Sequence, residues 1–107
     1  MNLGELIEYL ENKDKSIIIL RGFGKANSYR GYYEQIAFTP KNNVTVGDML
    51  AEAKKALGSM YQGYKGGRYV MDEYTEVWIC EPGTMFQNQK IGKLLLDYMM
   101  GIGPADN

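Results

Sequence analysis

Apolar residues recur every three or four positions in three segments of the chain, and this spacing is typical of a helix with one buried stripe. The segments are residues 3–12, 46–57 and 91–99. Two of them begin with the residues of a capping box, because Asn2 and Thr45 are each followed three positions later by an acidic residue. We therefore predict three helices that each pack one face into a core.

The ends of these helices are marked in the sequence as well. Asn88 is a candidate N-cap for the last helix. Gly58 and Gly101 follow the second and third helices, at the position where a left-handed terminating residue is common.

Shorter runs rich in β-branched and aromatic residues predict the strands. They are residues 16–20, 28–38, 68–71 and 75–80. The run at 16–20 is apolar on both faces, so we expect an interior strand there. Glycines and small polar residues at 21–28 and 40–43 are typical of loops and turns. Residues 72–74 are expected to join the last two strands as a hairpin.

This order of elements predicts an α+β fold, with a small, mainly antiparallel sheet of about four strands and two to three packed helices. The length of 107 residues fits a single domain over 1–107 with a loose tail at 101–107. Apolar residues make up 45% and charged residues 23%, which is close to the average of globular proteins. We therefore expect the chain to fold.

The composition argues against several classes of function. The chain has no histidine, which removes the usual zinc ligand and the Ser/His/Asp and Cys/His nucleophile pairs. We expect no catalytic residues, no metal site and no cofactor. Cys80 is the only cysteine, so no disulfide can form within the chain and a reducing cytoplasm is expected. No apolar run approaches a bilayer span, so no membrane partner is expected.

The charges are unevenly distributed along the chain. The net charge of −1 argues against general nucleic-acid binding. From Arg21 to Arg68, however, there are eight Lys or Arg residues and only three acidic residues. Any anionic partner is therefore expected to bind the middle of the chain.

Two segments in this middle part, residues 28–33 and 61–69, combine glycine, tyrosine and basic residues. Arg30 can make a bidentate contact with a phosphate while neighbouring tyrosine rings stack on a base. The glycines beside Lys65 can present backbone N–H groups to an anion. The candidate ligand-binding residues here are Tyr29, Arg30, Tyr32, Tyr33, Tyr64, Lys65, Gly66, Gly67 and Arg68.

Each of these features also has a purely structural interpretation. Arg30 is explained as well by an exposed strand position beside half-buried tyrosines, and the glycines around Lys65 by a flexible hairpin turn. No GxxxxGK[ST] spacing exists, and residues 22–24 lack the third glycine of a dinucleotide fingerprint. Trp78 lies in the middle of a predicted strand and is expected in the core, and Cys80 is expected as a small buried hydrophobe.

The last helix carries more apolar residues than one small core needs. Met99, Met100 and Ile102 extend its stripe. Surplus apolar surface indicates a homo-oligomer, a dimer or larger, in which pockets can form between subunits. A well-buried final helix explains the same residues.

Two motifs, SYRGYYEQIAF at 28–38 and GYKGGRYVM…TEVWIC at 63–80, flank a TVGDML helix start. In combination they resemble a group of small phage-encoded proteins that share SYRGYY, TVG and GYKGG elements, the first family of Thoeris anti-defence proteins. The resemblance covers residues 28–80. It implies a small antiparallel sheet with helices, and a symmetric oligomer that captures a cyclic ADP-ribose isomer, and also cyclic oligonucleotide signals, without cleaving them.

The resemblance also implies roles for individual residues. Arg30, Lys65 and Arg68 would hold phosphates, and the tyrosines at 29, 32, 33 and 64 would line the pocket. Phe86 and Asn88 would recognise a base.

The residues and the resemblance together predict a protein of the host cytoplasm that sequesters a small cyclic nucleotide signal. Two rivals remain open. One is an inhibitor that binds a host defence protein through a Tyr/Arg-rich surface. The other is a small nuclease or phosphodiesterase in which Lys65 acts with a carboxylate such as Glu34. A binder of single-stranded nucleic acid is disfavoured by the net charge.

Overall fold

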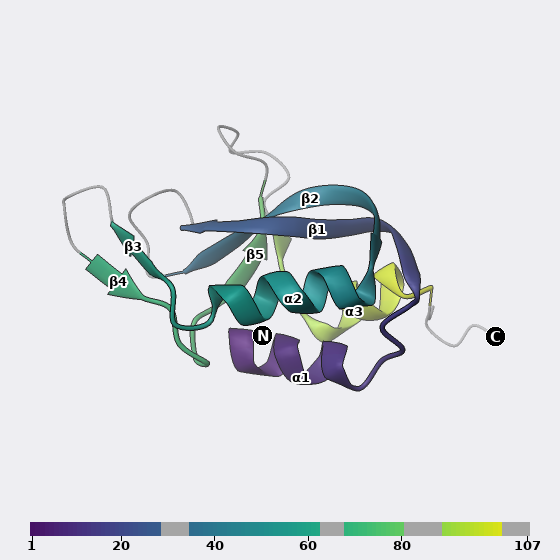
Figure 1. The fold of residues 1–107 in the computed structure, drawn as a ribbon, viewed down its shortest axis with the longest axis horizontal. Coiled ribbons are helices and arrows are strands. Elements are labelled where there is room, and N and C mark those ends of the chain that lie inside the picture. Colours follow the sequence, from purple (N-terminus) through teal and green to yellow (C-terminus); the bar gives the residue numbers. More distant parts are fainter. Residues whose placement is uncertain (29–34, 63–67, 81–88, 102–107) are drawn as a thin grey trace.

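The computed structural model describes residues 1–28, 35–62, 68–80 and 89–101. Within these residues the chain forms three helices, a four-stranded sheet and a separate two-stranded sheet (Figure 1). The predicted α+β class with a small, mainly antiparallel sheet is confirmed. None of the helices in these ranges is long and apolar enough to cross a membrane.

The helices begin where the sequence predicts them, with one exception. They are α1 (Leu3–Glu11), α2 (Val46–Ala56) and α3 (Lys93–Met99). The Asn2 side chain accepts a hydrogen bond of 2.9 Å from the N–H of Glu5, whose carboxylate in turn accepts from the N–H of Asn2. Thr45 and Asp48 form the same reciprocal pair at the start of α2. Both predicted capping boxes are therefore present.

The third helix starts later than predicted. Its N-cap is Gly92, which has no side chain to accept a hydrogen bond, and Asn88 lies outside the described residues. Ile91 is fully buried but precedes the helix. At the other end, Gly101 has a φ of +78°, and Gly58 after α2 has a φ of +83°, so both glycines occupy the left-handed region as predicted.

The larger sheet is built on one long hairpin. Its strands are β1 (Ile18–Ser28), β2 (Ile36–Thr45), β5 (Val77–Ile79) and β6 (Gln89–Lys90), in the order β1-β2-β5-β6. β1 pairs with β2 antiparallel, β2 with β5 parallel, and β5 with β6 antiparallel. The second sheet is the antiparallel hairpin β3 (Met60–Gln62) and β4 (Arg68–Val70).

The long hairpin corrects three predictions about the first half of the chain. Residues 28–38 are not one strand, because Ser28 pairs with Ile36 across the hairpin. Residues 21–28 are not a loop but the larger part of β1, and residues 40–43 are not a turn but part of β2. The pairing of β1 with β2 accommodates these turn-forming residues in two ways. Its register shifts between Phe23 and Ala26, and Asn43 adopts a positive φ. Cross-strand pairing therefore overrides the local turn preference.

Two further predictions about strands are wrong. Residues 68–71 and 75–80 do not form a hairpin with each other, because β4 pairs with β3 while β5 joins the larger sheet. The first strand is not interior either. Among the described strands, β1 is at the edge of its sheet, and Ile18 and Leu20 are largely exposed.

The core lies between the helices and the larger sheet. In Figure 1, α2 packs against the β1–β2 hairpin and α1 packs against α2. Fully buried side chains come from every layer: Leu3, Leu6, Leu10, Ile19, Phe23, Phe38, Met49, Ala53 and Leu96. The rings of Phe23 and Phe38 face each other across the hairpin with centroids 4.4 Å apart. These contacts hold α2 and the hairpin as one body.

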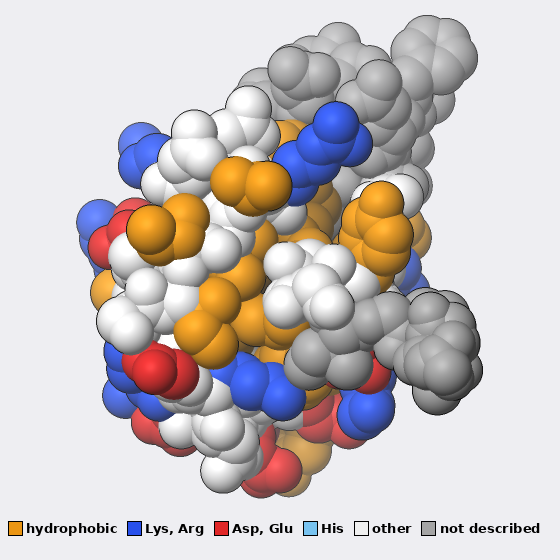
Figure 2. Space-filling model, turned by 90° about the vertical axis from the view of Figure 1, so that its right-hand side faces the viewer, with side chains coloured by type: hydrophobic (Ala, Val, Ile, Leu, Met, Phe, Trp, Pro, Cys, Tyr) orange, Lys and Arg blue, Asp and Glu red, His pale blue; other side chains and the backbone are white. Residues whose placement is uncertain are grey.

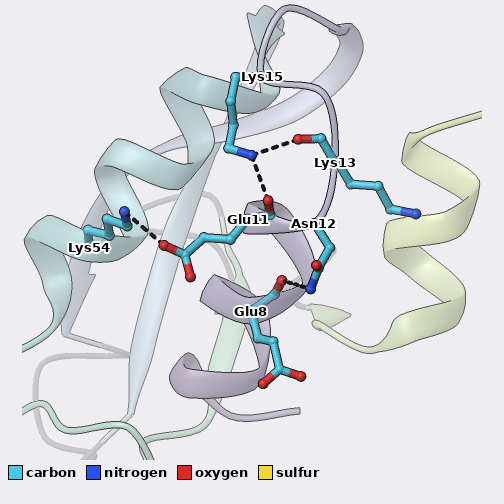
Figure 3. A network of polar contacts seen from close by, with 6 residues as sticks. All are labelled: Glu8, Glu11, Asn12, Lys13, Lys15 and Lys54. Carbon is cyan, nitrogen blue, oxygen red and sulfur yellow. Dashed lines mark hydrogen bonds and ion pairs between the residues drawn. The ribbon is translucent and has the colours of Figure 1, made fainter.

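A network of polar contacts stabilises the connection from α1 to β1 (Figure 3). The Lys15 ammonium donates to the main-chain oxygens of Glu11 and Lys13, at 2.7 Å each, so it satisfies carbonyls at the end of α1. The Glu11 carboxylate forms an ion pair of 2.9 Å with Lys54 of α2. Both side chains of that pair are about half exposed, so its contribution to stability is small.

Candidate functional site

Most of the predicted ligand-binding residues lie outside the described part of the chain. They are Tyr29, Arg30, Tyr32, Tyr33, Tyr64, Lys65, Gly66, Gly67, Phe86 and Asn88. The remaining candidate, Arg68, is the first residue of β4 and is exposed. The structure therefore shows the strand ends that precede and follow these residues.

The central residues of the two Gly/Tyr/basic segments lie in the connections of two neighbouring hairpins. Residues 29–34 lie between the end of β1 and the start of β2, and residues 63–67 between β3 and β4. β3 lies in contact with β1. The described ends of both hairpins point to the same end of the molecule, at the left of Figure 1. The fold thus brings together the entry and exit points of two segments that are separated in sequence by β2 and α2.

The segment that contains Phe86 and Asn88 is attached elsewhere. It follows β5 and leads into β6, and the end of β5 at Ile79 pairs with Phe38 inside β2. The start of β5 at Val77 pairs instead with Ile36, the first residue of β2. The connection 81–88 therefore begins near the Ile79 end of β5, whereas the connection 29–34 ends near its Val77 end.

A polar hollow of about 400 Å³ lies near the start of β2. It is lined by Gln35, Val70, Asp72, Tyr74, Thr75 and Glu76. Gln35 directly follows residues 29–34, and Val70 is the last residue of β4. The hollow therefore adjoins strands that come from both hairpins.

Hydrogen bonds fix the walls of this hollow. The Trp78 indole N–H donates to the side-chain oxygen of Gln35. The Asp72 carboxylate accepts from the N–H of Tyr74 at 2.9 Å, and the Thr75 hydroxyl accepts from the N–H of Asp72 at 2.9 Å. The turn after β4 is therefore held by its own side chains, and the amide of Gln35 is oriented before any ligand arrives.

The hollow is acidic. Asp72 and Glu76 contribute carboxylates to its lining, and Glu76 forms an ion pair of 2.6 Å with Lys90 of β6. Carboxylate oxygens accept hydrogen bonds, so this lining suits the amino or imino groups of a base rather than a phosphate. The cations that could hold phosphates, Arg68 among them, belong to the Gly/Tyr/basic segments.

Sequence reasoning missed the residues of this hollow. Gln35 lies in the SYRGYYEQIAF motif without an assigned role, and its proximity to Tyr74 depends on the parallel pairing of β2 with β5, which the sequence did not predict. Trp78 was assigned to the core, but it is only half-buried and contacts Gln35. Cys80 is likewise partly exposed rather than buried. Within the described ranges, no group of three or more Cys, Asp or Glu residues could hold a metal ion.

In comparisons with known proteins, no family model, no curated protein and no solved structure matches the chain.

Proposed function

We propose that this chain is a phage anti-defence protein that sequesters a cyclic nucleotide immune signal in the host cytoplasm without cleaving it. The ligand would be a cyclic ADP-ribose isomer or a cyclic oligonucleotide, and the protein would act as a homo-oligomer. The observation that supports the proposal is the adjacency of the two hairpins whose connections are the Gly/Tyr/basic segments.

The chemistry of the two segments complements such a ligand. Arg30, Lys65 and Arg68 supply cations for the phosphates, and an arginine can grip a phosphate through two parallel N–H groups. The tyrosines supply rings for stacking on a base. The adjoining acidic hollow offers the carboxylates of Asp72 and Glu76 as acceptors for the donor groups of the base edge. The cations belong to the two segments and the acceptors line the hollow, so the chain offers both kinds of group that a nucleotide requires.

The absence of histidine supports sequestration rather than turnover. With no histidine in the chain, the commonest general base near neutral pH is missing. A protein that only binds its ligand needs no such group, and its effect then depends on affinity and concentration.

The proposal is tested by calorimetric titration with a panel of cyclic ADP-ribose isomers and cyclic di- and trinucleotides. We expect at least one tight ligand, and chromatography of the ligand released by heat should return it intact. Arg30→Ala removes the bidentate phosphate contact and should weaken binding by about tenfold or more. Lys55→Ala is the matched control, because Lys55 is an exposed cation on α2 outside both segments.

The other outcomes favour the rivals. Recovery of a hydrolysed product would indicate a phosphodiesterase. A direct inhibitor would be indicated if no ligand of the panel binds and a host protein copurifies with the wild type but not with Arg30→Ala. Equal affinities of Arg30→Ala and Lys55→Ala would remove the assigned phosphate site.

A further inference from the structure

The first turn of α1 is hydrogen-bonded to the turn that lines the polar hollow. The N–H of Leu3 donates to the main-chain oxygen of Thr75 at 2.8 Å. The N–H of Gly4 donates to the main-chain oxygen of Glu73 at 2.9 Å. Both donors belong to the N–H groups at the start of a helix that have no partner within the helix. In Figure 1 the N-terminal end of α1 accordingly lies beside the connection from β4 to β5.

Residues 72–76 are held together as one unit, which we call the 72–76 turn. The Thr75 hydroxyl accepts from the N–H of Asp72 at 2.9 Å and donates to the Asp72 carboxylate at 3.3 Å. Thr75 is only 8% exposed. At the end of the turn, the main-chain oxygen of Glu76 accepts from the N–H of the first residue of β2 at 3.0 Å. A displacement of the turn therefore also moves Asp72 and Glu76, whose carboxylates line the hollow.

Gly4 allows the helix to approach this turn closely. A Cβ atom at position 4 would lie 3.1 Å from the Cβ of Glu73 and 3.2 Å from its main-chain oxygen. Contacts this short require the neighbour to move by a few tenths of an ångström. The neighbouring atoms belong to the backbone and to Cβ, so no change of side-chain rotamer can relieve the contact. Any larger residue at position 4 therefore displaces the 72–76 turn.

Other hollows of the molecule have a different lining. Figure 2 shows a face on which hydrophobic side chains gather in a central depression. Two hollows beside β1 and α3 are lined by apolar residues such as Leu20 and Met99, and among their described lining residues Arg21 carries the only charge. These hollows offer a cation where the hollow at the 72–76 turn offers carboxylates. Recognition of a base by carboxylates therefore depends on the position of that turn.

We infer that Gly4 is a positioning residue for the polar hollow. The first turn of α1 sets the position of the Asp72 and Glu76 carboxylates, and thereby the selectivity of the hollow for bases that carry an exocyclic amino group. This inference rests on the proposed function, because the hollow meets a base only if a nucleotide binds beside it. It assigns a role in recognition to a helix that lies outside both Gly/Tyr/basic segments.

The start of α2 repeats the arrangement at another place and supplies a matched control. The N–H of Val46 donates to the main-chain oxygen of Ile17 at 2.9 Å. The N–H of Gly47 donates to that of Lys15 at 2.9 Å, and a Cβ atom at position 47 would lie 3.2 Å from the same oxygen. Gly47 thus matches Gly4 in helix position, in hydrogen bonding and in closeness of contact. The segment that it contacts does not line the hollow.

Calorimetric titration measures the selectivity. The probes are cyclic diadenylate and the cyclic ADP-ribose isomers, each paired with an analogue in which hydrogen replaces the exocyclic amino group of adenine. The analogue should bind the wild type about tenfold or more weakly, because a hydrogen bond to a carboxylate is lost. Gly4→Ala should lower this ratio by about threefold or more, and Gly4→Val should lower it further. Gly47→Ala and Gly47→Val should keep the wild-type ratio.

The ratio separates positioning from stability. Both ligands of a pair are titrated into the same preparation, so any loss of folded protein cancels. In the ligand-free protein, Gly4→Ala should change the amide chemical shifts of residues 72–76, whereas Gly47→Ala should change those of residues 15–17. Unchanged shifts at 72–76 in Gly4→Ala would overturn the inference.

Failure of the inference and failure of the proposed function give different results. If no probe binds the wild type, sequestration of an adenine nucleotide is wrong and the hollow loses its assigned role. If the probes bind, but Gly4→Ala keeps the wild-type ratio or Gly47→Ala lowers it equally, only the positioning role is wrong. Equal affinity of the wild type for a probe and its analogue would show that the hollow does not select the amino group.

Discussion

Gly22 shows how closely α2 packs on the long hairpin, and its replacement by alanine gives a quantitative test of that packing. Gly22 is buried in β1, at a position opposite Lys41. A Cβ atom there would lie 2.6 Å from Val44 Cγ2, 2.8 Å from Met49 Sδ and 3.3 Å from Ile19 Cγ2. The first two distances are shorter than any stable contact between carbon or sulfur atoms.

The neighbours of Gly22 differ in their ability to move. Met49 can shift because its side chain is long and flexible. Val44 is β-branched, lies in β2 and has only 2% exposure, so it has little freedom to rotate. Inserting a methyl group into such a site costs about 1–3 kcal/mol. The lower entropy of alanine in the unfolded chain returns about 0.4–1 kcal/mol. We therefore expect Gly22→Ala to lower the free energy of unfolding by about 1–2 kcal/mol.

Gly24→Ala is the matched control on the same strand. Its Cβ would meet Lys41 Cδ at 3.0 Å, and Lys41 is exposed, so its side chain can move into solvent. This variant should be as stable as the wild type or slightly more stable, because only the unfolded-state entropy changes. The two alanine variants should differ in melting temperature by on the order of 10 °C.

Urea unfolding, monitored by Trp78 fluorescence and far-UV circular dichroism, measures the free energy of unfolding of both variants. The m-value should stay constant. The double variant Gly22→Ala/Val44→Ala should be more stable than the sum of the two single changes predicts, because the shortened side chain at 44 makes room for the new methyl group. Equal stability of Gly22→Ala and Gly24→Ala, or simple additivity with Val44→Ala, would refute the packing argument.

Three further outcomes are expected. Thr45→Ala removes the acceptor for the first turn of α2 and should cost about 1 kcal/mol in urea unfolding, whereas Thr45→Ser should cost little. The Tyr9 hydroxyl donates to Asp97 at 2.6 Å. Burial, and then this hydrogen bond, raise the pKa of Tyr9 above its ordinary value near 10. The protonated Tyr9 side chain therefore stabilises the fold fully below pH 10, and this stabilisation is lost as the pH rises further. Tyr9→Phe should remove that alkaline loss in thermal melts. The hydrogen bond from Tyr9, and then that from Lys93, lower the pKa of Asp97. The ionised Asp97 therefore stabilises the fold above its ordinary pKa near 4, and this stabilisation is lost as the pH falls through the lowered value. Asp97→Asn should make the loss of stability in acid less steep.

The candidate site was only partly predictable from the sequence. Its cations and rings are visible because Arg30 and Lys65 lie in compact Gly/Tyr motifs. The adjoining hollow is not visible, since Gln35 and Glu76 become neighbours only through the pairing of Ile36 with Val77. Residues 41 positions apart leave no periodic signal in a single sequence.

The sequence alone determined where α1 and α2 begin, where α2 and α3 end, and the chemistry that the chain lacks. The capping boxes at Asn2 and Thr45 and the terminators at Gly58 and Gly101 act over three or four residues, so local spacing is sufficient to specify them. The composition likewise excludes every mechanism that requires histidine.

Only the tertiary structure decided the strand arrangement. Residues 21–28 and 40–43 read as loops because their glycines, proline and asparagines favour turns locally, yet they form the two strands of one ladder. The parallel pair of β2 with β5, the edge position of β1 and the exposure of Leu20 depend on hydrogen bonds and packing between distant segments. Such contacts stabilise the sheet as a whole and outweigh the local turn preference of each short segment. A single sequence does not reveal them, because the strands that pair are distant from each other along the chain.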